Sequence, residues 1–184
     1  MNFLEKKKIL LIISGGIAAY KSLDLIRSFT KLQCEVKTIL TKGGAEFVTP
    51  LSIASLSKNK VYSDMYSVEN ESEMDHISLS RWADLILIAP ATSNIIAKMS
   101  QGISDDLATT VVQASNKSIF VCPAMNVRMW ENASNKQNLE KIKSYNYRII
   151  GPFNGEMACG EYGDGRMADI KYILNELDNF FKSK

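Results

Sequence analysis

The chain has 184 residues, of which 46% are apolar and 23% are charged. This length fits one domain, and the composition excludes a disordered chain, collagen and a small disulfide scaffold. With 22 basic and 20 acidic side chains the formal net charge is +2, and no basic run indicates a nucleic-acid surface. Three cysteines, an odd number, do not indicate a disulfide framework and favour a reducing compartment.

The N-terminus imitates a signal peptide, because three lysines at 6–8 precede an apolar run at 9–13. That run is shorter than the roughly 7–15 apolar residues of a secretory leader and the roughly 20 of a membrane span. We therefore expect a soluble protein located in the cytoplasm.

Apolar runs alternate with helical stretches along the chain. Residues 9–13 are continuously apolar and end at glycines, as in a strand buried on both faces of a parallel sheet. Residues 17–32 follow with apolar side chains at helical spacing. The same criteria predict further strands at 36–40, 84–89, 119–122 and 147–150, and helices at 45–48, 50–56, 93–99, 105–114, 139–145 and 170–181.

This alternation predicts an α/β protein with an open parallel sheet and helices on both faces, in one domain over residues 1–184. Residues 152–169 differ from the rest, because they contain four glycines and little periodicity. We interpret this segment as a mobile, structureless flap of the kind that often has a function.

Polar and glycine-rich residues follow three of the predicted strands, where open α/β sheets bind ligands. The turn Ser14-Gly15-Gly16-Ile17-Ala18 opens a helix whose N-terminus would favour a phosphate. Thr41, rather than an acidic residue, ends the second strand, which favours a mononucleotide over a dinucleotide. A tight turn without any ligand explains this motif equally well.

Thr92, Ser93 and Asn94 follow the next central strand. One such residue caps a helix, so two remain for ligand contact. After the following strand, residues 123–130 (PAMNVRMW) combine Asn, Arg, Trp and two Met in a way that packing alone does not explain.

His76 is the single histidine, and a lone histidine is more often structural than catalytic. Cys159 lies among glycines and is a candidate reactive thiol, although loop cysteines are common. Cys34 and Cys122 lie in or beside strands and are expected in the core. One histidine without a CxxC pair or HExxH predicts no metal site, and the absence of GxSxG argues against a serine hydrolase.

Taken together, these stretches resemble the homo-oligomeric flavin-containing cysteine decarboxylases, which have a Rossmann-like or flavodoxin-like fold. The PxMNxxMW block is the most specific part, and the glycine-rich flap with its cysteine is the most discriminating. The resemblance is carried by SGGIAAYKSLDLIR (14–27), HISLSRWADLILIAPATSNIIAK (76–98), GISDDLATT (102–110), PAMNVRMW (123–130) and GEMACGEYGDGRMAD (155–169).

The resemblance implies a carboxy-lyase of coenzyme A biosynthesis that converts 4′-phospho-N-pantothenoylcysteine into 4′-phosphopantetheine. In this family FMN oxidises the cysteine side chain to a thioaldehyde, CO₂ leaves to give an enethiolate, and the electrons then return with a proton.

By match to the family, His76 is the active-site base, Cys159 is the proton donor, and Asn126 contacts the reacting part of the substrate. Substrate contacts also carry over to Met129 and, in the flap, to Ala158 beside Cys159. The FMN contacts carry over to Gly15, Gly16, Ile17, Thr41, Thr92, Ser93, Asn94 and Ala124.

Family members assemble as trimers or multiples of trimers such as dodecamers, so His76 would act on FMN held mainly by a neighbouring subunit. A phosphopantothenate–cysteine ligase is a possible partner, because this decarboxylase is often fused to one. Three alternative functions differ from this pattern: a peptidyl-cysteine decarboxylase lacks the cysteine of the ACG motif, a flavin prenyltransferase-like enzyme lacks PxMNxxMW, and a non-catalytic FMN-binding regulator usually lacks the His, Asn or Cys.

Overall fold

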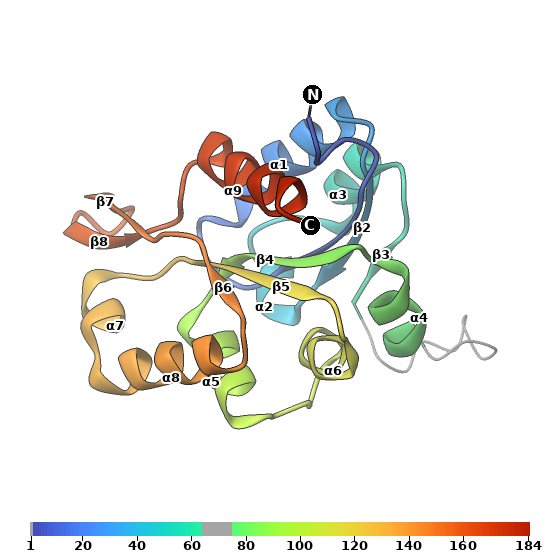
Figure 1. Cartoon of the computed structure of the whole chain (residues 1–184). Coiled ribbons are helices and arrows are strands. Elements are labelled where there is room, and N and C mark those ends of the chain that lie inside the picture. The colour runs from blue at the N-terminus through green and yellow to red at the C-terminus, as the bar shows by residue number, and fades with distance from the viewer. Residues whose placement is uncertain (1, 64–74) are drawn as a thin grey trace.

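The computed structural model describes residues 2–63 and 75–184. Its centre is a six-stranded parallel sheet in the order β3-β2-β1-β4-β5-β6 (Figure 1). The strands are β1 (Lys8–Ile13), β2 (Glu35–Leu40), β3 (Val61–Tyr62), β4 (Leu85–Ala91), β5 (Ser118–Pro123) and β6 (Arg148–Ile149).

The central strands are apolar throughout because both faces of the sheet are covered. In β1, Leu11 belongs to one core, and its neighbours Leu10 and Ile12 belong to the core on the opposite face. The same alternation occurs in β4, where Leu87 joins the first core and Ile86 joins the second.

Helices α1, α3 and α9 bury apolar side chains in the first core, and α4, α5, α6 and α8 bury theirs in the second. The helices are α1 (Ala19–Lys31), α2 (Lys42–Ala45), α3 (Pro50–Ser57), α4 (Asp75–Trp82), α5 (Ser93–Gln101), α6 (Leu107–Ala114), α7 (Val127–Glu131), α8 (Ala133–Ser144) and α9 (Ile170–Lys182). The prediction of an open parallel α/β sheet with helices on both faces is confirmed, and its strand order is the Rossmann-like one.

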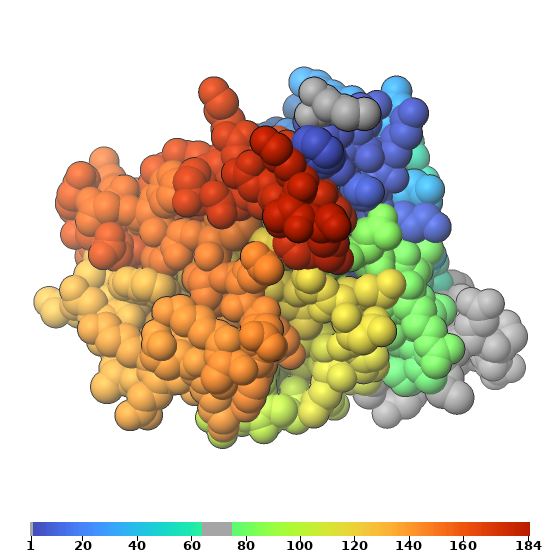
Figure 2. Space-filling view, viewed as in Figure 1, coloured from blue at the N-terminus to red at the C-terminus, as the bar shows by residue number. Residues whose placement is uncertain are grey.

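The last helix packs beside the N-terminal residues (Figures 1 and 2). The backbone N–H of Leu4 donates to the Asp178 carboxylate at 2.9 Å, and the Lys7 ammonium lies 5.0 Å from the centre of the Phe181 ring. These contacts fix α9, and therefore the segment that leads into it, against the sheet.

The prediction that residues 152–169 lack regular structure is wrong. This segment contains an antiparallel hairpin of β7 (Phe153–Glu156) and β8 (Tyr162–Arg166), shown at the edge of the molecule in Figure 1. Its glycines hid the strands from a search for apolar alternation, because backbone hydrogen bonds, rather than a buried apolar face, pair the two strands.

Three smaller predictions also differ from the structure. The short helix predicted at 45–48 lies earlier, at α2, because the Thr41 side chain caps it by accepting from Gly44 N–H at 3.1 Å. Strand β4 continues through Pro90, and the helix predicted at 139–145 begins at residue 133, where Asn132 caps it. The described helices include none long and apolar enough to cross a membrane.

Candidate active site

A cavity of about 1400 Å³ opens at the carboxyl ends of the parallel strands. Its wall is built by the loops that follow β1, β2, β4 and β5 together with the turn of the β7–β8 hairpin. Ligands of open α/β sheets bind at this edge because the loops converge there.

The glycine turn after β1 brings bare backbone to the cavity. A Cβ on Gly15 would lie 2.7 Å from the Gly43 carbonyl carbon. The glycine turn can therefore pack against the turn after β2 only because residue 15 has no side chain. A Cβ on Gly16 would meet only Thr92, at 3.7 Å. Within the described ranges, the backbone N–H groups of residues 15–18 have no hydrogen-bond acceptor, and no side chain caps α1. Such a turn is suited to bind an anion.

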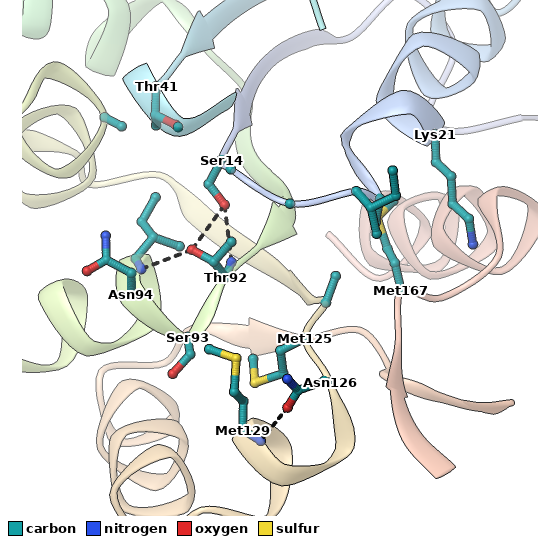
Figure 3. A pocket seen from close by; sticks show the side chains of 18 of the residues that line it. Ser14, Lys21, Thr41, Thr92, Ser93, Asn94, Met125, Asn126, Met129 and Met167 are labelled. Atoms are coloured by element: carbon teal, nitrogen blue, oxygen red, sulfur yellow. Dashed lines mark hydrogen bonds between the residues drawn. The ribbon is translucent and has the colours of Figure 1, made fainter. Parts of the chain in front are cut away.

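The second helix N-terminus of the site is joined to the first by hydrogen bonds. The Ser14 hydroxyl donates to the Pro90 carbonyl at 2.7 Å. It also accepts from the Thr92 N–H at 3.1 Å (Figure 3). Thr92 caps α5 by accepting from the Ile95 N–H at 3.3 Å. Ser93 and Asn94 also line the cavity, and their side chains make no hydrogen bond within residues 2–63 and 75–184. The division predicted from sequence, one cap and two free polar side chains, is what the structure contains.

The loop after β5 presents Asn126. Its side-chain oxygen caps α7 by accepting from the Met129 N–H at 2.8 Å, which fixes the orientation of the amide (Figure 3). The amide nitrogen thus stays available as a donor to a ligand. Met125 N–H donates to the Gly165 carbonyl at 3.0 Å, so this loop is tied to the hairpin.

The hairpin places Cys159 at the cavity. The thiol is exposed and donates to a carboxylate oxygen of Glu161 at 3.7 Å. Gly165 has φ +140°, and a Cβ there would overlap the Met125 carbonyl, so only glycine lets β8 pass this close to the loop after β5. The other two cysteines are buried as predicted, and burial raises the pKa of Cys34 and of Cys122.

His76 lies outside this cavity. It is half-buried near the start of α4, at the other end of the molecule from the hairpin (Figure 1). Within one chain the structure therefore does not bring His76 to Asn126 or Cys159.

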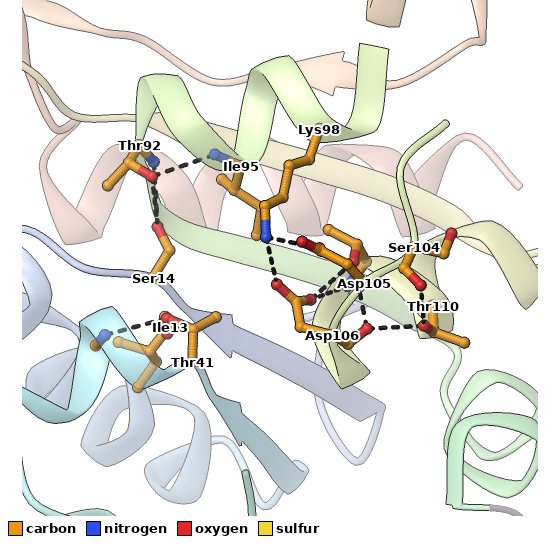
Figure 4. A network of polar contacts seen from close by, with 12 residues as sticks. Ile13, Ser14, Thr41, Thr92, Ile95, Lys98, Ser104, Asp105, Asp106 and Thr110 are labelled. Atoms are coloured by element: carbon orange, nitrogen blue, oxygen red, sulfur yellow. Dashed lines mark hydrogen bonds and ion pairs between the residues drawn. The ribbon is translucent and has the colours of Figure 1, made fainter. Parts of the chain in front are cut away.

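An ion cluster forms another part of the wall. The Lys98 ammonium donates to Asp105 at 2.7 Å and to Asp106 at 3.0 Å (Figure 4). The hydrogen bond to Asp105 raises the pKa of Lys98. Burial opposes ionisation of Asp106, but hydrogen bonds from Thr109 and Lys98 outweigh it and hold the pKa of Asp106 below its usual value. The cluster ties the loop before α6 to α5 and so shapes the cavity.

Apart from His76, all site residues predicted from the sequence line the cavity: Gly15, Gly16, Ile17, Thr41, Thr92, Ser93, Asn94, Ala124, Asn126, Met129, Ala158 and Cys159. Sequence reasoning missed several more lining residues: Lys21, Lys98, Asp105, Asp106, Met125, Met157, Arg166 and Met167. For Lys21 a signal existed, since it lies one helical turn after Ile17. In the described part of the chain no cluster of His, Cys, Asp and Glu could hold a metal ion.

Curated relatives match nearly the whole chain at 38–42% identity. A coenzyme A biosynthesis bifunctional protein CoaBC of Haemophilus influenzae is 42% identical over 98% of this chain and 45% of its own length. A probable phosphopantothenoylcysteine decarboxylase of Streptococcus mutans is 38% identical over 94% of this chain and 97% of its own length. The chain spans about half the length of the first curated relatives that it matches.

Solved structures with more than 30% identity have the same fold. A cysteine-to-serine mutant of a PPC decarboxylase, complexed with pantothenoylaminoethenethiol, matches with a TM-score of 0.86 and 31% identity, covering 97% of this chain and 100% of its own. The FMN binding protein AtHal3 matches with a TM-score of 0.83 and 33% identity, covering 98% and 99%. The flavoprotein family model matches residues 2–182, and the chain belongs to the flavoprotein family.

Proposed function

We propose that this chain is an FMN-dependent carboxy-lyase that converts 4′-phospho-N-pantothenoylcysteine into 4′-phosphopantetheine, a step of coenzyme A biosynthesis in the cytoplasm. One observation carries the proposal: two helix N-termini, the α7-capping Asn126 and an exposed Cys159 line the same cavity. Family membership and the relatives named above support it.

The residues present fit FMN. Its phosphate needs donors without side chains in the way, and the unpaired N–H groups of residues 15–18 supply them beside the start of α5. The other proposed contacts, Thr41, Thr92, Ser93, Asn94 and Ala124, line the adjoining wall. When bound, FMN supplies the two-electron redox chemistry that amino-acid side chains lack.

The chain's own residues bind, orient and transfer protons. Asn126 is oriented by its cap to α7 and would hold the cysteine end of the substrate, beside Met129. His76 would remove a proton from that end. Ala158 and Cys159 would close over it, and the Cys159 thiol would donate the proton that accompanies the return of two electrons to the enethiolate, which gives the saturated thiol product.

The cofactor assignment is tested by Gly16→Asp. Gly16 is a better position for this test than Gly15, because any side chain at Gly15 would clash with the Gly43 backbone whether or not FMN is bound. We expect Gly16→Asp to lose FMN, because a carboxylate would repel the phosphate where bare amides should meet it. The matched control is Gly16→Ala, whose Cβ makes an ordinary contact with Thr92. The absorbance ratio of flavin to protein after purification measures occupancy, and full FMN occupancy in Gly16→Asp would refute the assignment.

The position of His76 leads us to infer that the active site is shared between subunits of a trimer or a multiple of trimers, such as a dodecamer. Mixing inactive His76→Asn and Cys159→Ser chains before assembly should then restore activity at about a quarter of the sites, since each site draws the two residues from different chains. Turnover assays on the refolded mixture measure this. If the mixture is as inactive as its components, His76 acts within its own chain.

Turnover assays of the wild-type protein with different substrates distinguish the alternative functions. A peptidyl-cysteine decarboxylase would release CO₂ from a peptide with a C-terminal cysteine, a flavin prenyltransferase-like enzyme would consume an allylic phosphate, and a regulator would do neither. We expect turnover of the pantothenoylcysteine substrate alone.

We also propose that residues 1–184 fold as one domain, with 152–169 as the segment that covers the substrate. A phosphopantothenate–cysteine ligase would be its functional partner.

A further inference from the structure

Two cationic side chains with few partners lie on the hairpin side of the cavity. Lys21 extends from α1 beside Met167 (Figure 3). The residue is half-buried, and no hydrogen bond or ion pair reaches its ammonium from residues 2–63 or 75–184. Burial and the nearby Arg166 charge lower the pKa of Lys21, and Asp169 opposes this. An ammonium in such surroundings gains from an anion.

Arg166, at the end of β8, is the second cation. One of its terminal nitrogens, Nη1, donates to the Asp169 carboxylate at 3.1 Å. Its Nε is buried without an acceptor, packed against Gly155, where a Cβ would lie 3.0 Å away. A buried donor without a partner is costly, so the guanidinium is incompletely compensated. Asp169 is the one carboxylate with a recorded interaction with this pair, and Glu156 of the hairpin also lines the cavity.

We propose that Lys21 and Arg166 form an anion subsite for the phosphate at the non-reacting end of the substrate. This inference rests on the proposed function and adds to it the residues that recognise the phosphate. The subsite differs from the glycine turn, which offers bare amides to the cofactor phosphate. Lys and Arg side chains instead offer full charges, which suit a phosphate dianion.

The substrate has a second anionic group, the carboxylate that leaves as CO₂, and it suits this pair less well. Cations that bind a carboxylate stabilise the ground state, in which the charge is present, more than the transition state, in which it moves away. Such contacts would slow decarboxylation. The phosphate keeps its charge throughout the reaction, so its binding positions the substrate without this penalty.

The experiment measures binding and turnover separately. Calorimetry with the FMN-loaded protein gives the Kd of 4′-phosphopantothenate and of pantothenate, which differ only in the phosphate. We expect Arg166→Gln to weaken phosphopantothenate binding by about 10- to 100-fold, the range for a lost charge-assisted hydrogen bond, and to leave pantothenate binding unchanged. The kcat/KM for phosphopantothenoylcysteine should fall by the same factor, while that for pantothenoylcysteine should not.

Two variants separate this subsite from a structural ion pair. Asp169→Asn removes the competing carboxylate, so an anion subsite predicts equal or tighter phosphopantothenate binding, whereas a structural pair predicts the same damage as Arg166→Gln. Arg27→Gln is the matched control, because Arg27 is exposed on α1 and does not line the cavity.

Three results would overturn the inference. Equal losses for the phosphorylated and unphosphorylated substrates would assign the pair to the carboxylate. Loss of FMN from Arg166→Gln would assign it to the cofactor phosphate. Unchanged binding would leave the pair no role in recognition. If the wild type decarboxylates neither substrate, the proposed function fails, but the two binding constants still decide whether the subsite exists.

Discussion

His76→Asn should abolish decarboxylation while the protein keeps its FMN and its assembly. If His76 is the base at the reacting carbon, its loss should slow turnover by about 10²–10⁴-fold, the usual contribution of a general base. Asparagine retains hydrogen-bonding groups but cannot take up a proton at neutral pH. CO₂ release, flavin absorbance and size-exclusion chromatography measure the three properties.

The matched control is Ser78→Ala, which changes a half-buried side chain on the same helix and removes its hydrogen bond to the Asp75 carbonyl. We expect this variant to stay active. Loss of a catalytic base would reduce the rate of decarboxylation far more than tenfold. If His76→Asn keeps its fold and its rate falls by less than about tenfold, His76 is a structural residue of α4.

Cys159→Ser should stop the reaction halfway. The oxidation and the loss of CO₂ do not require Cys159, so one CO₂ per site should still appear. A serine hydroxyl is a much weaker acid than a thiol, so the enethiolate should not receive its proton from position 159. The product should then be the enethiol, about 2 Da lighter than 4′-phosphopantetheine because two hydrogens are never returned. Mass spectrometry of the product measures this difference.

Cys34→Ser is the control for cysteine replacement. The Cys34 thiol is buried and donates to the Leu4 carbonyl at 3.1 Å, an interaction that a serine hydroxyl can also make. We expect Cys34→Ser to form 4′-phosphopantetheine. Formation of this product by Cys159→Ser would show that water or another acid protonates the intermediate, and it would remove the main residue that argues against a peptidyl-cysteine decarboxylase.

The core of the fold was predictable because burial leaves a direct trace in the sequence. Strands β1 and β4 are buried on both faces, so their apolar runs stand out. Helix α1 buries only one face, so Leu25, Ile26 and Phe29 recur at helical spacing. The hairpin left no such trace, because its strands are mostly glycines and polar residues and are paired by backbone hydrogen bonds.

The sequence by itself determined five of the six strands of the sheet, the glycine turn, the polar start of α5 and the loop of Asn126, because local patterns encode each of them; the two-residue strand β3 was not predicted. Only the tertiary structure decided which distant residues meet. Met125 joins the loop after β5 to Gly165 of β8, forty residues further along the chain, and the charge of Arg166 acts on Lys21, which is far from it in sequence. His76, which local pattern could not place, lies away from the cavity of its own chain. Contacts of this kind depend on how the elements pack, and no local spacing records them.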